Sequence, residues 1–299
     1  MTFWGTLKDG SQMLLGEPRS ASLTYDRDAP ADLLEAVFPA DRVWEELVWV
    51  TACRQGETVF RGMVDEQNTR LTDSGITVEL VCRSGEALLL DNEAPPGTIQ
   101  RPTLEKLGKT LLEPLGITRA VGEAAAPGEL VIEKGTSCWT VLSDFCQTLL
   151  GAQPYVDCQG VLHCEGAPER ELRLGEVLSA TLALAPCKRI SEVRQQSFRG
   201  GYDTPYRNQA AVVERRRYGS MQSGEDPREV IARGERESFS LTVECPGLLW
   251  PLRGGKADVE VPGLGKFSGC PVRSGRALWD GNGQRTQIVL ERGAVTCCG

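Results

Sequence analysis

The sequence predicts a mainly β protein in which two β regions flank a small α+β module. Three observations favour this fold class: apolar residues alternate with period two before residue 92 and after residue 171, two capped helices lie between, and one β pattern occurs near both ends. We expect domains at residues 1–94, 95–170 and 171–299. A chain of 299 residues can hold two or three domains with their own cores.

The repeated pattern occupies residues 59–83 and residues 266–292. Each copy contains Phe-x-Gly, a turn rich in Gly and Asp, and a closing strand that begins at Thr and ends at Arg. The same β unit near both ends of a chain indicates one structural unit that is used twice. Strand–turn–strand patterns are common, so two copies with few identities can also arise by chance.

The first β region is read from its alternation and its turns. Residues 47–53 are rich in β-forming side chains, and the polar residues 54–57 turn the chain into the next strand. Residues 76–83 place apolar side chains on one face of a half-buried strand. The segment 32–38 begins with a candidate N-cap, Asp32, and ends before Pro39, so it predicts either one or two turns of helix or an irregular bridge.

The middle region changes to helical spacing after the Pro- and Gly-rich break at 92–97. Thr103 is the expected N-cap of a helix that continues to about residue 113. A strand is predicted at 129–133, and a second helix at 137–150, which Gly151 ends. Residues 155–164 predict a hairpin with its turn at Gln159 and Gly160, which completes a small helix–hairpin domain.

The last region returns to β structure. Between residues 218 and 237 the chain is polar, and we expect an excursion from the barrel with a short helix near 227–232. Strands are predicted at five segments, which are 179–184, 191–198, 209–214, 238–243 and 257–261.

Charge and hydropathy exclude several classes of function. The net charge is −8 and cations alternate with carboxylates, which disfavours phosphate-backbone binding and sequence-specific nucleic-acid recognition. The basic run at residues 215–217 follows Glu214 in a predicted strand, where a solvated or interface strand is the expected role. No apolar run is long enough for a membrane-spanning segment, and the N-terminus lacks the features of a signal peptide. We therefore expect assembly in a cytoplasm.

Catalytic and metal-binding patterns are weak. The single histidine, His163, alternates with Cys164 on a strand, so the two side chains point to opposite faces and cannot bind one metal. The 11 cysteines, including Cys158 and the terminal pair Cys297 and Cys298, fit the role of small semi-buried hydrophobes.

Other segments that resemble functional motifs also have a simpler structural interpretation. The glycine-rich segment 263–269 resembles a phosphate loop but predicts a hairpin turn, because its flanks are β. Carboxylate pairs among Asp41, Glu45 and Glu46 match ordinary surface charge as well as a glycosidase pair. We expect no enzyme activity and no catalytic, cofactor-binding or metal-binding residues, and hence no cofactor.

Several short motifs along the chain together resemble one known family. They lie at residues 7–10, 81–91, 103–107, 115–117, 138–142 and 155–164. In this combination the chain is similar to the baseplate hub proteins of contractile phage tails, the late-control-protein D family with its Mu-like and Bacillus-prophage-like branches. One position departs from the pattern: Leu88 stands where many relatives have an acidic residue, which puts in doubt the interaction that the acid makes but not the fold.

The resemblance implies a structural role in the virion. Three copies, each with two barrels that resemble the tail-tube fold, would form a ring that adapts the sixfold tail tube to the threefold central spike. The partners implied are further copies of the chain, the tail tube protein, the spike protein, and the baseplate wedge and tape-measure proteins. A closed ring uses heterologous interfaces, so exposed strand edges are expected to pack between copies. The negative net charge would suit the channel of such a ring, because like charges would keep passing DNA from binding to its wall.

Two other classes of function stay open at this point. One is a distal-tail or receptor-binding adaptor of a non-contractile tail, which is also β-rich and ring-forming. The other is a tail-associated cell-wall hydrolase, although relatives of that kind carry a separate lytic domain. A trimer favours the hub and a hexamer favours the adaptor.

Overall fold

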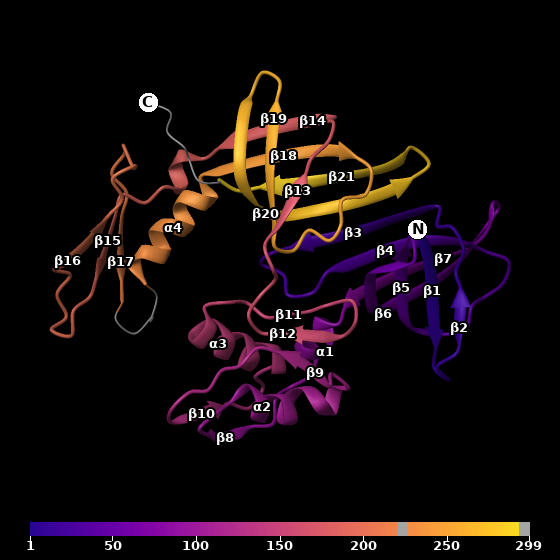
Figure 1. Cartoon of the computed structure of the whole chain (residues 1–299), viewed down its shortest axis with the longest axis horizontal. Helices are drawn as coiled ribbons and strands as arrows, with labels where there is room; N and C mark the ends of the chain where they lie inside the picture. Colours follow the sequence, from indigo (N-terminus) through magenta and orange to yellow (C-terminus); the bar gives the residue numbers. More distant parts are fainter. Residues whose placement is uncertain (221–225, 293–299) are drawn as a thin grey trace. The chain divides into compact units, whose positions relative to one another are not determined.

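The structure is a computed structural model that describes residues 1–220 and 226–292 (Figure 1). Strands hold 48% of the chain and helices 16%, which confirms a mainly β protein. The chain divides into two compact units. The first comprises residues 1–170, 247–254 and 274–286, and the second comprises 171–246, 255–273 and 287–299. Each unit is therefore built from segments that are distant in sequence.

An antiparallel sheet forms the larger part of the first unit. The strands before residue 85 are β1 (Thr2–Leu7), β2 (Gln12–Leu14), β3 (Ser20–Asp26), β4 (Leu33–Ala40), β5 (Leu47–Arg54), β6 (Glu57–Thr72) and β7 (Gly75–Ser84). Their order in the sheet is β3-β4-β7-β6-β5-β1-β2. The C-terminal strand β20 (Gly265–Asp280) adds its residues 274–279 beside β3, in antiparallel pairing with residues 21–26. A strand from the end of the chain thus completes the sheet begun at its start.

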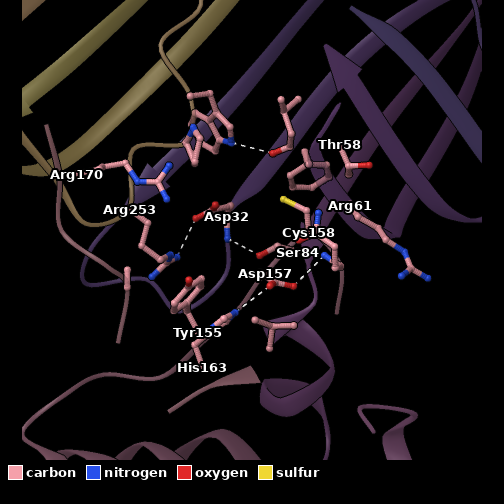
Figure 2. Close-up of a pocket in the computed structure, with 17 residues that line it drawn as sticks. Asp32, Thr58, Arg61, Ser84, Tyr155, Asp157, Cys158, His163, Arg170 and Arg253 are labelled. Atoms are coloured by element: carbon pink, nitrogen blue, oxygen red, sulfur yellow. Dashed lines mark hydrogen bonds and ion pairs between the residues drawn. The ribbon is translucent and has the colours of Figure 1, made fainter. Parts of the chain in front are cut away.

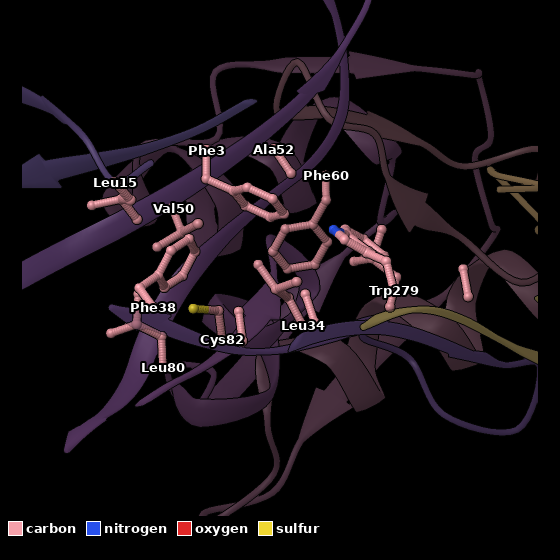
Figure 3. Packing of buried hydrophobic residues seen from close by; sticks show 14 of the residues in the cluster. Phe3, Leu15, Leu34, Phe38, Val50, Ala52, Phe60, Leu80, Cys82 and Trp279 are labelled. Carbon is pink, nitrogen blue, oxygen red and sulfur yellow. The ribbon is translucent and has the colours of Figure 1, made fainter. Parts of the chain in front are cut away.

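The core of this sheet is aromatic (Figure 3). Phe3 lies edge-on to Phe38, with ring centroids 5.4 Å apart, and stacks on Trp279 of β20 at 5.9 Å. Phe60 is also buried in this cluster. Alternation along each strand places these rings on the inner face, so the period-two pattern of the sequence is realised as a packed core.

The prediction for residues 32–38 was wrong, because the segment is strand β4 and not a helix or an irregular bridge. Leu34, Ala36 and Phe38 are buried on one face, while Glu35 is exposed on the other. The alternation is that of a strand, and pairing with both β3 and β7 outweighs the local signals of Asp32 and Pro39.

The middle module belongs to the first unit. Its helices are α1 (Glu86–Asp91), α2 (Leu104–Leu107) and α3 (Cys138–Leu150), and its strands are β8 (Gly97–Gln100), β9 (Arg119–Val121), β10 (Glu129–Ile132), β11 (Tyr155–Val156) and β12 (Val161–His163). The Thr103 hydroxyl accepts the backbone N–H of Lys106 at 3.2 Å, as expected of an N-cap. α2 continues as a π-helical turn at Gly108–Leu112 and a 3-10 turn at Glu113–Leu115. Both predicted helices and the 155–164 hairpin are confirmed.

The second unit has a β core and a separate small sheet. Its elements are β13 (Arg170–Arg173), β14 (Ser179–Leu184), a 3-10 turn (Pro186–Lys188), β15 (Glu192–Gln195), β16 (Thr204–Arg207), β17 (Arg216–Gly219), α4 (Pro227–Glu237), β18 (Phe239–Pro246), β19 (Gly255–Val261) and parts of β20 and β21 (Gly283–Leu290). β14 pairs with β18, and β19 pairs with both β13 and β20. β15 pairs with β16 and β17 in its own sheet.

Two predictions for this region have different outcomes. The strand expected at 209–214 is wrong: those residues connect β16 to β17, and the basic run contributes Arg216 and Arg217 to β17. The helix expected near 227–232 is confirmed as α4 and is longer, and its N-cap Asp226 accepts the Arg228 N–H at 2.9 Å. Val212 and Val213 are exposed, so their apolar character does not come from a buried strand face.

The repeated pattern falls in two long hairpins, β6–β7 and β20–β21, each opening with a 16-residue strand. The Phe-x-Gly residues serve different roles in the two copies. Phe60 is core, and Gly62 has no room for a Cβ, which would lie 2.5 Å from the Arg83 carbonyl oxygen. Gly269 instead has φ +60° and open space around it. The equivalence of two barrels stays a prediction.

Candidate functional site

A cavity of about 310 Å³ lies in the first unit (Figure 2). The start of β4, the end of β7, the β11–β12 hairpin and the segment 247–254 all contribute to its wall. The polar and aromatic residues of its lining include Asp32, Arg61, Ser84, Tyr155, Asp157, Cys158, His163, Arg170, Trp250 and Arg253. It gathers several titratable side chains in one concave place, which makes it the candidate site.

An ion pair between Asp32 and Arg253 forms one wall of the cavity. The two side chains are 2.9 Å apart, and both are largely buried. Arg253 also donates to the Pro30 carbonyl oxygen at 3.1 Å and lies 4.9 Å from the ring centroid of Tyr25. Burial raises the pKa of Asp32, and the positive charge of Arg253 opposes that shift. The pair joins residues that are 221 positions apart in the sequence.

Beside the Asp32–Arg253 pair, the carboxyl group of Glu86 forms a second set of buried polar contacts. Its side chain is only 1% exposed, and its Oε1 accepts the Val156 backbone N–H at 2.8 Å. The Ser84 hydroxyl donates to Oε2 at 2.6 Å and accepts the Asp32 N–H at 2.8 Å. One carboxyl group therefore connects the start of β4, the end of β7 and the β11–β12 hairpin. Burial raises the pKa of Glu86 to about 7.

The raised pKa predicts how stability depends on pH. The folded protein keeps a proton on Glu86 up to about pH 7, whereas the unfolded chain releases it near the ordinary value of 4.5. The free energy of unfolding should therefore fall as pH rises through this window, by up to about 3 kcal/mol from this group. Urea denaturation of Glu86→Gln should show a weaker pH dependence there, with the exposed Glu45→Gln as control. Identical pH dependence in Glu86→Gln and the unmodified protein would contradict the assignment.

The cavity also brings together Cys158, His163 and Asp157, a combination of residue types found in cysteine hydrolases. His163 Nε2 lies 2.8 Å from an Asp157 carboxylate oxygen, and its ring stacks on Tyr155 at 4.8 Å. Burial and the nearby carboxylates, however, raise the pKa of Cys158 to about 11. Catalytic cysteines have a lowered thiol pKa, because the thiolate is the nucleophile. The Cys158 thiol stays protonated at neutral pH, so this arrangement does not support nucleophilic catalysis.

The other residues that the sequence singled out lie apart from the cavity or serve the fold. Cys164 points into the core of the middle module beside Cys146, away from His163, as the strand alternation predicts. Asp41, Glu45 and Glu46 are exposed in the connection between β4 and β5, and Glu46 pairs with Lys8. Residues 263–269 contain the β19–β20 turn and the start of β20. Cys297 and Cys298 lie outside the described residues. Within residues 1–220 and 226–292, no three His, Cys, Asp or Glu side chains are grouped to hold a metal ion.

Sequence reasoning missed the residues of the buried ion pair, Asp32 and Arg253, and those of the buried hydrogen bonds, Glu86 and Ser84. Glu86 and Ser84 lie inside the 81–91 motif, whose pattern in the sequence does not show which of its side chains are buried. Asp32 was interpreted as a helix cap. Arg253 carries no local signal, because its role depends on a partner far away in the sequence.

Comparison with known proteins shows the fold. No protein-family model matches the sequence, and no curated protein is significantly similar to it. A 43 kDa tail protein of prophage MuSo2 from Shewanella oneidensis is similar in structure with TM-score 0.78 and 17% identity, covering 98% of each chain. A tail protein from Neisseria meningitidis matches with TM-score 0.74 and 18% identity, over 97% of this chain and 96% of that one.

A type VI secretion component and a chain of a PdpA–VgrG complex are also similar in structure. An Escherichia coli component of the type VI secretion system, described as structurally similar to T4 bacteriophage tail proteins, matches with TM-score 0.57 and 10% identity over 94% of this chain and 74% of that one. The chain spans 52% of a matching chain in a Francisella PdpA–VgrG complex, with TM-score 0.60 and 8% identity. The chain therefore shares its fold with phage tail proteins and with a type VI secretion component. Within the described residues, no helix is long and apolar enough to cross a membrane.

Proposed function

We propose that this chain is the structural baseplate hub of a contractile phage tail or of a related injection machine. In this role three copies form a ring that adapts the sixfold tail tube to the threefold central spike. The observation that supports the proposal most strongly is the structural likeness to two phage tail proteins, which extends over nearly the whole of each chain. The matched stretch includes both β regions and the α+β module between them.

The proposal assigns one tube-like barrel to residues 1–94 and a second to residues 171–299, with the α+β module at 95–170 between them. Each region contains a hairpin that opens with a strand of 16 residues. Three copies would present six such units toward the tube and a threefold axis toward the spike. The partners are then the tube, spike, wedge and tape-measure proteins, and the place of action is the tail of the virion after assembly in the host cytoplasm.

The cavity fits a structural role better than a catalytic one. Its charged groups are occupied in holding distant segments together, and its cysteine is a poor nucleophile. We accordingly propose no enzymatic activity. Incubation of the purified protein with peptidoglycan should release no soluble products, and release that is lost in His163→Ala would overturn this part of the proposal.

The mass of the assembled particle tests the proposed function. Three copies of the 32.6 kDa chain should give a particle of about 98 kDa in sedimentation velocity or native mass spectrometry. A hexamer, at about 196 kDa, would instead support a distal-tail adaptor. A protein that stays monomeric in these measurements, even at a chain concentration of about 100 μM, would contradict both ring-forming roles.

A further inference from the structure

The small sheet of the second unit carries charge opposite to that of the rest of the chain. We call residues 189–219, which contain β15, β16 and β17, the arginine arm. The arm has seven arginines and three acidic residues, a net charge of +4, whereas the remainder of the chain has a net charge of −12. Every cation of the arm is arginine and none is lysine. Arginine is the basic residue most enriched in protein–protein interfaces.

Part of this charge is balanced inside the arm. The Glu192 side chain, which is buried, lies 2.6 Å from Arg194, 3.0 Å from Arg207 and 3.7 Å from Arg216. Hydrogen bonds from Arg194 lower the pKa of Glu192, which therefore stays ionised. Arg216 also pairs with Glu214, so three guanidinium groups face two carboxylates and the cluster retains a positive surplus. The buried carboxylate holds the three strands in place and leaves the arginines at the surface.

Arg189 pairs with Glu235 of α4 at 3.4 Å, but Arg199 and Arg217 have no carboxylate partner among the described residues. Arg199 lies over the ring of Phe198, 5.4 Å from its centroid. Arg217 donates to the carbonyl oxygen of Arg216 at 3.0 Å and forms no ion pair with a described side chain. These two guanidinium groups are available to acidic groups of a partner.

The arm also exposes large apolar side chains next to its arginines. Phe198 is 81% exposed, Val212 97% and Tyr218 61%. In contrast, Val193 is the one fully buried apolar side chain among the residues described in the arm. Three strands of four residues need an apolar face against another surface for stability. On one side α4 provides part of that cover, since it contacts β15 and also β18 of the same unit (Figure 1).

We propose that the arginine arm docks onto the acidic surface of a second copy of this chain and forms the contact between neighbouring copies in the ring. Charge complementarity favours this occupant, because the remainder of each copy is strongly negative. A ring of identical copies needs one patch to meet a different patch, and an arm of opposite charge supplies that asymmetry. The net charge of −8 on the whole chain favours this occupant over nucleic acid, whose phosphate backbone an acidic chain repels. This inference rests on the proposed ring.

The test measures assembly of the full chain by sedimentation velocity. The variant Phe198→Ala/Arg199→Glu/Arg217→Glu should weaken self-association by about 100-fold or more, because it removes an aromatic anchor and reverses two charges. The matched control Arg42→Glu/Arg119→Glu makes the same charge changes at exposed positions of the first unit and should assemble like the unmodified chain. Unchanged far-ultraviolet circular dichroism confirms that the variants fold; tryptophan fluorescence would report only on the first unit, which holds every tryptophan.

The outcomes separate this inference from the proposed function. If the unmodified chain forms no ring, the proposed function fails and the inference falls with it. If the unmodified chain and the arm variant assemble equally, the inference alone is overturned. Assembly that is unchanged between about 50 mM and about 500 mM NaCl would also overturn it, since contacts between exposed charges are screened by salt. An arm variant that assembles normally but loses DNA binding would assign the arm to nucleic acid instead.

Discussion

Replacing Asp32 by alanine is expected to lower the free energy of unfolding of the first unit by about 3–5 kcal/mol. The change removes the counter-charge of Arg253, whose guanidinium would stay buried against Tyr25 without its carboxylate partner. Urea denaturation followed by tryptophan fluorescence measures the effect on this unit alone. All six tryptophans of the chain, at positions 4, 44, 49, 139, 250 and 279, belong to the first unit.

The strand that follows Asp32 offers a control for the effect of burial. Glu35 of β4 pairs with Arg276 at 3.1 Å, but both side chains are about half exposed. Glu35→Ala should therefore cost no more than about 1 kcal/mol. The double variant Asp32→Ala/Arg253→Met should be more stable than the sum of its two single changes predicts, since it leaves no buried charge. Additive effects of the two single changes would show that the pair is not coupled.

Replacing Phe3 by alanine is expected to destabilise the first unit by about 3–5 kcal/mol. The Phe3 side chain is completely buried, and it contacts Phe38 from β4 and Trp279 from β20. Truncation leaves a cavity between rings from both ends of the chain, and the surrounding sheet can close it only in part. The measurement is again urea denaturation, with the midpoint and slope of the transition compared with those of the unmodified chain.

Leu71→Ala is the control for this change, because it truncates an apolar side chain that is 79% exposed in the same unit. Its effect on the free energy of unfolding should stay within about 0.5 kcal/mol. If Phe3→Ala is also this mild, the aromatic cluster is not the core that its burial indicates.

Local signals in the sequence were sufficient for most of the secondary structure. Both capped helices of the middle module and the turn at Gln159 and Gly160 were predicted where they occur, because caps and turns depend on neighbouring residues. The candidate site was not predicted in the same way. In the sequence Glu86, Asp32 and Arg253 look like ordinary charged residues. Arg253 meets Asp32 from 221 positions away, and Glu86 accepts the N–H of Val156 from 70 positions away.

The sequence by itself determined a β, then α+β, then β order, two long hairpins, and an acidic chain with few residues suited to catalysis. Only the tertiary structure decided that residues 32–38 form a strand, since that depends on pairing with β3 and β7 on either side. The tertiary structure also decided that β20 completes the first sheet, and that Arg253 meets a carboxylate 221 positions away. Periodicity and capping act over a few residues, whereas sheet order and buried ion pairs depend on contacts that the chain makes only when it is folded.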